Sequence, residues 1–559
     1  MNSSKSNNLK IVLIAIVVFG LIFGVVTVTQ NWGKSNNTVS EEASLKKLDS
    51  LYSRLSINKP MPKLDPDFQM EDEGAARISV LPDISEYPFI VNPTTDQFIT
   101  IYSSTEKAMW LADIANRFNM SGMTVGGKPV SVGVRAVPSS LGADFISSGK
   151  YMPDAYLPAS SVYGDMLTSH GVRVNLVEER LAGNISGIVI SSKKNDALTK
   201  KHGDLTIGAI SESVLKGDLA LGYTTPLSNE DGFSFILSLL SSFDNSDPVS
   251  DSSIARLREF QDRVPLIAYD NDQLKAALTG GTLDAIVLSY QGYMSSPNLK
   301  SSFVFVPIDT RLDNPVYEIG DLSAAKKEIL AGFVSFCKGA EAQQSATDKG
   351  FNGMDERGSA VSMNGATILQ IQDIYKREKN GSSGITAVFV ADVSGSMEGA
   401  PMLNLKASLN HAIGVIDSNS NIGLVTFSDG VNIPVPIAKF DSVQKSYFSY
   451  AVKAMNATGG TAMYDAVVVA QKMLMDAKAA NPNTKLMLFV LTDGEANRGY
   501  SFRDIEGITS GLRIPVYTIG YNADIDELQR LSNINEATTM NADSDNVIYR
   551  IESLFNAQM

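Results

Sequence analysis

Short apolar runs alternate with stretches of helical period over most of this chain. In the first half the apolar runs are rich in β-branched and aromatic residues, as strands are, and this alternation predicts an α/β fold. Predicted strands cover residues 98–102, 130–137, 187–190, 219–223, 285–288 and 303–307, and predicted helices cover residues 106–118, 251–262, 271–279 and 323–337.

Beyond residue 384 the apolar runs become nearly continuous. Strands that are apolar throughout, with helices between them, predict a parallel sheet covered on both faces. The predicted strands cover residues 385–391, 422–427, 485–491 and 514–520, with helices at 401–416 and 464–480. The charged and then small residues at 377–384 predict a linker, so we expect one domain at 96–376 and another at 385–559.

The N-terminus has a different pattern. Residues 11–28 form an apolar run long enough to cross a bilayer, and Lys5 and Lys10 precede it. No Ala-x-Ala site or lipoprotein cysteine follows, so we expect a cytoplasmic tail at 1–10, an uncleaved transmembrane anchor at 11–29 and an extracellular body, with a cleaved signal peptide as the alternative. Residues 30–95 are polar and carry six prolines, which predicts a stalk or linker.

Composition excludes several function classes. A net charge of −14 and a pI near 4.9 argue against nucleic acid as a partner, because phosphate contacts need clustered Lys and Arg. The single cysteine, Cys337, lies in an apolar stretch and forms no disulfide within the chain. Three isolated histidines offer neither a zinc cluster nor a His-dependent triad.

Oxygen-bearing side chains follow the predicted strands of the second domain. Asp392, Ser394 and Ser396 alternate in the loop after the strand at 385–391, Asp493 follows the strand at 485–491, and Thr461 ends a Gly-Gly-Thr turn before a helix. Loops at the carboxyl ends of parallel strands converge on one edge of the sheet. Two carboxylates and three hydroxyls suit a hard cation, so we expect Mg²⁺, with Mn²⁺ or Ca²⁺ as alternatives.

The sequence 392–397, Asp-Val-Ser-Gly-Ser-Met, resembles the metal-ion-dependent adhesion motif of von Willebrand factor A (VWA) domains. Thr461 and Asp493 match the family's other two ligand positions. The resemblance covers about residues 385–559 and implies a doubly wound, Rossmann-like fold that binds a protein through the metal, with an acidic side chain of the partner completing the coordination sphere.

The first domain resembles bacterial extracellular solute-binding proteins. The resemblance rests on residues 99–104, 138–140, 153–161, 221–226 and 281–285 and covers about residues 96–370. It implies two α/β lobes around a cleft, like a periplasmic binding protein, with hydroxyls and helix N-termini that favour a small polar or anionic solute. Candidate ligand-binding residues are Ser103, Ser104, Ser139, Ser140 and Thr224, although the same residue types also cap helices and form turns.

These observations predict a single-pass membrane protein that binds a partner at the cell surface and is not an enzyme. A solute receptor of a transport system, with the VWA domain used for docking, is an alternative. A metal-dependent hydrolase is a further one, but the metal loops themselves contain no Asp-x-Asp pair, Walker loop or histidine base.

Overall fold

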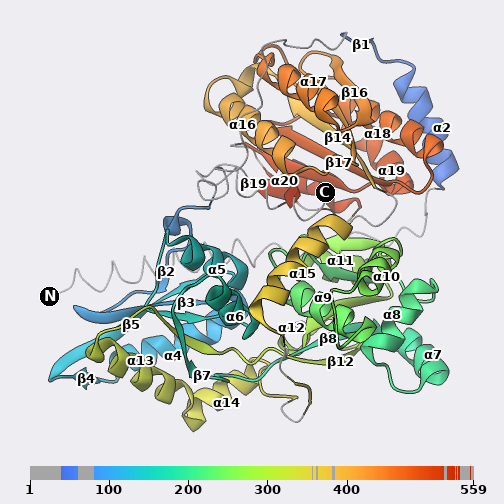
Figure 1. Cartoon of the computed structure of the whole chain (residues 1–559). Coiled ribbons are helices and arrows are strands. Elements are labelled where there is room, and N and C mark those ends of the chain that lie inside the picture. The colour runs from blue at the N-terminus through green and yellow to red at the C-terminus, as the bar shows by residue number, and fades with distance from the viewer. Residues whose placement is uncertain are drawn as a thin grey trace.

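The computed structural model describes residues 40–60, 81–354, 357–359, 363–379, 384–521, 525–535, 537, 539–541 and 554–555. Two bodies are visible in Figure 1. One consists of two lobes and is called here the two-lobed domain (residues 81–379). The other is a sheet between two helical layers and is called the three-layer domain (residues 40–60 and 384–555).

Each lobe of the two-lobed domain is built on its own sheet. In spatial order, lobe 1 has β2 (Phe89–Val91), β5 (Lys128–Ala136), β3 (Gln97–Ser103), β6 (Ala155–Leu157), β13 (Val316–Ile319) and β7 (Val174–Glu178), with β4 (Thr124–Val125) paired to β5. Lobe 2 has β10 (Leu266–Ala268), β9 (Leu221–Thr224), β11 (Ala285–Ser289), β8 (Ile185–Ser191) and β12 (Phe303–Arg311).

Helices cover both sheets because each strand must bury its apolar side chains. Lobe 1 carries η3 (Ile84–Glu86), η4 (Thr105–Lys107), α4 (Ala108–Met120), α5 (Ser139–Ser148), α6 (Val162–Ser169), α13 (Ala324–Cys337) and α14 (Ala340–Asp348). Lobe 2 carries α7 (Ser192–His202), α8 (Ile207–Leu215), α9 (Glu230–Phe243), α10 (Asp251–Gln261), α11 (Asn271–Gly280) and α12 (Tyr290–Met294). A last helix, α15 (Gly365–Glu378), lies against α6 of lobe 1 and α10 of lobe 2.

The sheet of the three-layer domain places the predicted metal loops. Its order is β1 (Ile57–Asn58), β16 (Val431–Lys439), β15 (Asn421–Phe427), β14 (Ile385–Asp392), β17 (Lys485–Thr492), β18 (Val516–Gly520) and β19 (Thr539–Asn541). Strands β15, β14, β17 and β18 run parallel, so their carboxyl ends share one edge, called here the carboxyl edge. At the opposite edge, Lys485 Nζ donates to the carbonyl oxygen of Gln261 in lobe 2, at 3.0 Å.

Both faces of this sheet are buried, as the continuous apolar strands predict. Along β14, Phe389 packs into one apolar cluster and Val388 and Val390 into another, because successive side chains point to opposite faces. The helices that supply the two clusters are α16 (Ala400–Val415) and α17 (Ser442–Lys453) on the first face, and α2 (Glu41–Tyr52), α18 (Met463–Ala480), α19 (Phe502–Leu512) and α20 (Ile525–Asn533) on the second. The short η5 (Gly395–Met397) follows β14.

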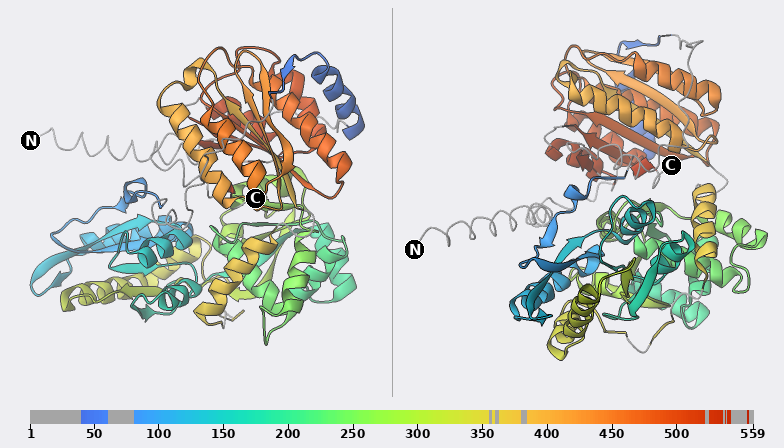
Figure 2. Two further views of the ribbon diagram at one scale, coloured as in Figure 1. Left: turned by 45° about the horizontal axis from the view of Figure 1, so that its top comes forward. Right: turned by 60° about the vertical axis from the view of Figure 1, so that its left-hand side comes forward.

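The predicted stalk at 30–95 differs from the structure. Helix α2 packs on α18 and α19, and β1 extends the three-layer sheet by pairing with β16. Leu48 and Leu51 of α2 are buried, and removing such side chains from water stabilises the packed position. The views in Figure 2 show this N-terminal segment against the three-layer domain. In the sequence, the segment is separated from the rest of that domain by the whole two-lobed domain. The two-lobed domain is therefore inserted between two parts of the three-layer domain.

The sheet is also mixed rather than wholly parallel, which corrects the prediction. Strand β16 runs antiparallel to β15. Pro434 and Pro436 lie in β16 beyond Val431 and Asn432, which pair with β1, and the register with β15 is irregular there. Proline is tolerated at sheet edges and bulges because it lacks a backbone donor. These prolines interrupt the strand pattern in the sequence.

The predicted transmembrane anchor at 11–29 lies outside the described residues. Among the helices that the structure describes, none combines the length and the apolar character that a membrane span requires.

Candidate metal centre

Asp392 ends β14 at the carboxyl edge, and its side chain is fully buried. Its two carboxylate oxygens have different donors. The backbone N–H of Ser394 donates to Oδ1 at 2.7 Å, and the hydroxyl of Thr492, the last residue of β17, donates to Oδ2. The Thr492 donor depends on the parallel pairing of β14 with β17, and the Ser394 donor comes from the loop after β14, so the sheet and the loop together fix the orientation of this carboxylate.

A chain of oxygens leads from this buried position to solvent. The hydroxyls of Ser394 and Ser396 lie 3.1 Å apart, and the Ser396 hydroxyl donates to Oδ1 of Asp493 at 2.8 Å. Ser394 is buried, Asp493 is partly buried and Ser396 is exposed. The cluster is therefore accessible from one side, on the side of Ser396.

Thr461 belongs to the neighbouring loop and is buried. Gly395 N–H donates to the carbonyl oxygen of Gly459 at 3.0 Å, which joins this loop to the one after β14. The side chain of Asn497 supports the threonine, because its Oδ1 accepts from Thr461 N–H at 2.9 Å and its Nδ2 donates to Thr461 Oγ1 at 3.4 Å. Four of the five predicted residues thus share a hydrogen-bond network, and Thr461 lies on an adjoining loop.

Neither carboxylate has a positive partner among the residues that the structure describes. Burial raises the pKa of Asp392 to about 6, while hydrogen bonds from Thr492 and Ser394 lower it and the charge of Asp493 raises it. Burial also raises the pKa of Asp493, against the hydrogen bond from Ser396. Within the described part of the chain, neither carboxylate forms an ion pair with Lys, Arg or His. A bound cation would supply the missing charge, so the donor set fits a hard divalent ion.

The site differs from a site built from carboxylates, histidines or cysteines alone. Among the described residues, no group of three or more His, Cys, Asp and Glu side chains is placed to hold a metal ion. The predicted set has only two carboxylates and relies on hydroxyls for the rest, which leaves a bound ion electrophilic toward further ligands.

Sequence reasoning missed several supporting residues. Thr492 and Asn497 orient Asp392 and Thr461, but neither type is distinctive in a sequence. Asp429 accepts from Gly460 N–H at 2.8 Å and pairs with Arg498 at 3.0 Å. Asp465 accepts from Tyr500 N–H at 2.7 Å. The last two carboxylates shape the loops around the site.

The residues proposed from sequence to bind a solute are mostly engaged within the protein. Ser103, Ser104, Ser139 and Thr224 are buried, and Ser140 is partly buried. The Ser103 hydroxyl donates to Ser104 O, the Ser104 hydroxyl contacts Glu106 and Lys107, that of Ser139 accepts from Ala159 N–H, and that of Thr224 donates to Asn229. Solute binding by these residues stays a prediction.

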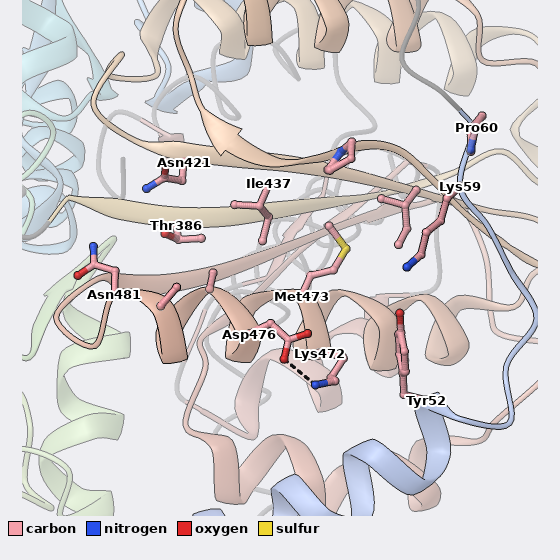
Figure 3. Close-up of a pocket in the computed structure, with 14 residues that line it drawn as sticks. Tyr52, Lys59, Pro60, Thr386, Asn421, Ile437, Lys472, Met473, Asp476 and Asn481 are labelled. Atoms are coloured by element: carbon pink, nitrogen blue, oxygen red, sulfur yellow. Dashed lines mark hydrogen bonds and ion pairs between the residues drawn. The ribbon is translucent and has the colours of Figure 1, made fainter.

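A groove of about 710 Å³ lies elsewhere in the three-layer domain, between α18 and the end of the N-terminal segment (Figure 3). Thr386 and Asn421, which line it, are at the amino ends of β14 and β15. Lys472 and Asp476 form an ion pair at 2.5 Å on its wall. The groove is therefore separate from the carboxyl edge.

Two regions of the chain match known families. Residues 387–556 match the von Willebrand factor type A domain, and residues 99–352 match the bacterial extracellular solute-binding proteins. Inter-alpha-trypsin inhibitor heavy chain H1 of Mesocricetus auratus is 26% identical over 175 residues, covering 28% of this chain and 19% of that protein. A VWA domain-containing protein of Dictyostelium discoideum is 27% identical over 209 residues, covering 36% of this chain and 23% of that protein.

The chain thus spans about a fifth of the length of these curated relatives. Among solved structures, the sulfate-binding protein SubI from Mycobacterium tuberculosis H37Rv is 13% identical, with a TM-score of 0.35, and the match covers 50% of this chain and 91% of that one. The chain carries a VWA domain, which is the three-layer domain, and a solute-binding-like domain, which is the two-lobed domain, and both are modules that generally bind rather than catalyse.

Proposed function

We propose that this chain is a membrane-anchored extracellular binding or scaffold protein whose three-layer domain binds a protein partner through a divalent metal ion. The observation that supports this function is the pair of carboxylates at the carboxyl edge. Asp392 and Asp493 are desolvated, have hydroxyl donors and have no positive partner among the described residues. Such a pair favours a cation over an empty site.

The five residues Asp392, Ser394, Ser396, Thr461 and Asp493 would hold the ion. Mg²⁺ is the preferred candidate, since few carboxylates and several hydroxyls suit a small, hard cation that keeps part of its water shell; Mn²⁺ and Ca²⁺ are alternatives. A bound ion would attract an acidic side chain of the partner. The exposure of Ser396 gives that side chain a route of approach.

The proposed location combines the anchor predicted at 11–29 with the fold. Helix α2 begins at Glu41, soon after the predicted span, and packs on the three-layer domain. We place the body outside the cell and the three-layer domain near the membrane. The partner would then be another extracellular or membrane protein.

Affinity capture from native membranes tests the proposal. The wild-type full chain and Asp392→Ala serve as bait, each with Mg²⁺ and with EDTA. The matched control is Glu398→Ala, because Glu398 is an exposed acidic residue beside the metal loops that makes none of the contacts described above. We expect one set of partners that is captured by wild type and Glu398→Ala in Mg²⁺ and lost in EDTA and in Asp392→Ala. Capture that survives both EDTA and Asp392→Ala would overturn the proposal.

A further inference from the structure

The region where the two lobes meet, called here the cleft and defined by Ser104, Glu106, Lys107, Ser139 and Glu230, contains a carboxylate that reaches from one lobe to the other. Helix α5 of lobe 1 begins at Ser139 after Pro138, which provides no side-chain cap. Glu230, the first residue of α9 in lobe 2, accepts a hydrogen bond from Ser139 N–H at 3.1 Å. A helix N-terminus attracts anions because its first N–H groups lack partners within the helix. Here the protein's own glutamate takes that place.

A buried lysine lies nearby and is also satisfied from within. Lys107 is fully buried, and its ammonium group donates to Asn314 Oδ1 at 3.0 Å, to Pro158 O at 3.1 Å and to the Ser104 hydroxyl. Burial lowers the pKa of Lys107, and the charges of Glu106 and Glu230 raise it, so both carboxylates lie near the ammonium group. The lysine's donors are used by the protein, and none needs a solute.

The same contacts fix both connections between the lobes. Asn314 lies between β12 of lobe 2 and β13 of lobe 1, and its Nδ2 donates to Ala182 O at 2.8 Å. Ala182 lies in the other connection, between β7 and β8. Lys107 thus holds Asn314, and Asn314 holds the second crossover. A buried polar network therefore ties both connections to lobe 1.

Helix α15 joins the lobes on a further side. At its start, a Cβ on Gly365 would lie 2.1 Å from Asp165 O, so this end packs directly on α6 of lobe 1. At its other end, Glu378 pairs with Arg258 of α10 at 2.8 Å. Tyr163 of lobe 1 and Phe233 of lobe 2 also have ring centroids 6.0 Å apart, within one apolar cluster that includes both lobes.

We propose that the two-lobed domain is closed by its own side chains, with the Glu230 carboxylate occupying the anion position at the N-terminus of α5. The domain then acts as a fixed scaffold for the three-layer domain rather than as a receptor that closes on an anionic solute. Glu230 is the specificity-determining residue: while it is present, its side chain occupies the position that an oxyanion would need. This inference does not depend on the proposed metal site.

Removing the glutamate tests the inference by a gain of binding. The full chain, purified in detergent, is compared as wild type, Glu230→Ala, Glu230→Gln and the control Glu259→Ala, whose glutamate is exposed on α10. The probes are inorganic sulfate and phosphate, measured by titration calorimetry. We expect wild type to bind neither anion, and Glu230→Ala to bind at least one of them because the helix terminus becomes available; wild type should give no signal even at about ten times the variant's dissociation constant. Glu230→Gln keeps an oxygen that can accept from Ser139 and should resemble wild type.

A distance measurement tests closure independently. Spin labels at Glu328→Cys in lobe 1 and Thr199→Cys in lobe 2 report lobe separation, and native Cys337 is fully buried and therefore protected from labelling. We expect one narrow distance distribution in wild type without solute, and a broader distribution in Glu230→Ala that narrows with the bound anion. A broad wild-type distribution, wild-type binding of either oxyanion, or a Glu230→Ala protein with neither change would overturn the inference. If Glu230→Ala fails to fold, the wild-type measurements still decide between the outcomes.

Discussion

The carboxyl edge of the three-layer domain and the cleft of the two-lobed domain both gather carboxylates, but their charges have different partners. At the carboxyl edge, Asp392 and Asp493 have hydroxyl and backbone donors and no cationic partner among the residues that the structure describes. In the cleft, Lys107 and the N-terminus of α5 meet Glu106 and Glu230 from the same chain. The first arrangement would accommodate a cation from outside, as proposed, whereas the second has both charges supplied by the chain. Two sites with similar residues can therefore have opposite roles.

The largest expected effect is on the stability of the two-lobed domain, where Lys107 is paired within the chain. Lys107→Met leaves Asn314, Pro158 O and a carboxylate without their donor, and breaking a buried charged network costs about 3–5 kcal/mol of stability. Urea unfolding of the full chain, followed by the fluorescence of Trp110 in the core of lobe 1, measures the loss. The control is Lys193→Met, at an exposed position on α7. Equal stability of the two variants would contradict the idea that the cleft network holds the domain together.

The three-layer domain should instead gain stability when a metal ion binds at its carboxyl edge. Mg²⁺ at a hundred times its dissociation constant is expected to stabilise the three-layer domain by about 2.7 kcal/mol. Hydrogen exchange of the β14 and β17 amides, with and without Mg²⁺, measures the gain. Asp392→Asn should show no gain, whereas the neighbouring Glu398→Gln should behave as wild type. Similar protection of Asp392→Asn by Mg²⁺ would place the ion elsewhere.

Asp231, in the first turn of α9 in lobe 2, is a buried carboxylate whose hydrogen bonds only partly offset its desolvation. It therefore differs from the paired charges of the cleft. Burial raises its pKa to about 6, against a hydrogen bond donated by Asn271 at 3.1 Å. The folded state then binds more protons than the unfolded state between pH about 4 and 6, so stability falls as pH rises through this window. The contribution is roughly 2–3 kcal/mol. The free energy of unfolding, measured at several pH values, should fall between pH about 4 and 6 in wild type more steeply than in Asp231→Asn. The same pH dependence in both proteins would contradict the prediction.

The smallest effect concerns the link between the metal loops and the N-terminal segment. The Tyr500 hydroxyl donates to Leu51 O at 2.9 Å, and Tyr500 N–H binds Asp465. Tyr500→Phe removes one hydrogen bond and should cost about 1 kcal/mol. Faster amide exchange in α2 would reveal it, with Tyr447→Phe on the opposite face as the control. Unchanged exchange in α2 would show that its apolar contacts suffice.

The loops at the carboxyl edge could be located from the sequence because their information is local, and metal binding by them stays a prediction. The strand before Asp392 is apolar throughout, and the strand and loop together fix where its carboxylate lies; the structure extends the predicted strand at 385–391 by one residue. The pairing of Asp392 with Thr492 needed only the further expectation that β14 and β17 are neighbours.

Other features depend on contacts between distant residues or were hidden by composition. Lys107 and Asn314 are 207 residues apart, so no local pattern announces their hydrogen bond. For α2, a signal was present: Ser40 caps the helix, and Leu45, Leu48 and Leu51 recur at helical spacing. The prolines between residues 60 and 93 favoured a stalk instead. In β16, Pro434 and Pro436 obscured a strand that tertiary pairing stabilises.

The docking of α2 also has a consequence for the order of folding. Ser44 of α2 contacts Gly507, 463 residues further along the chain, so the helix cannot reach its final position until nearly the whole protein has been made. At typical rates of synthesis, the interval is roughly 20–90 s. During that time its leucines have no native surface to cover. A chaperone that shelters this short segment would therefore raise the yield of the mature protein more than one acting on the later helices.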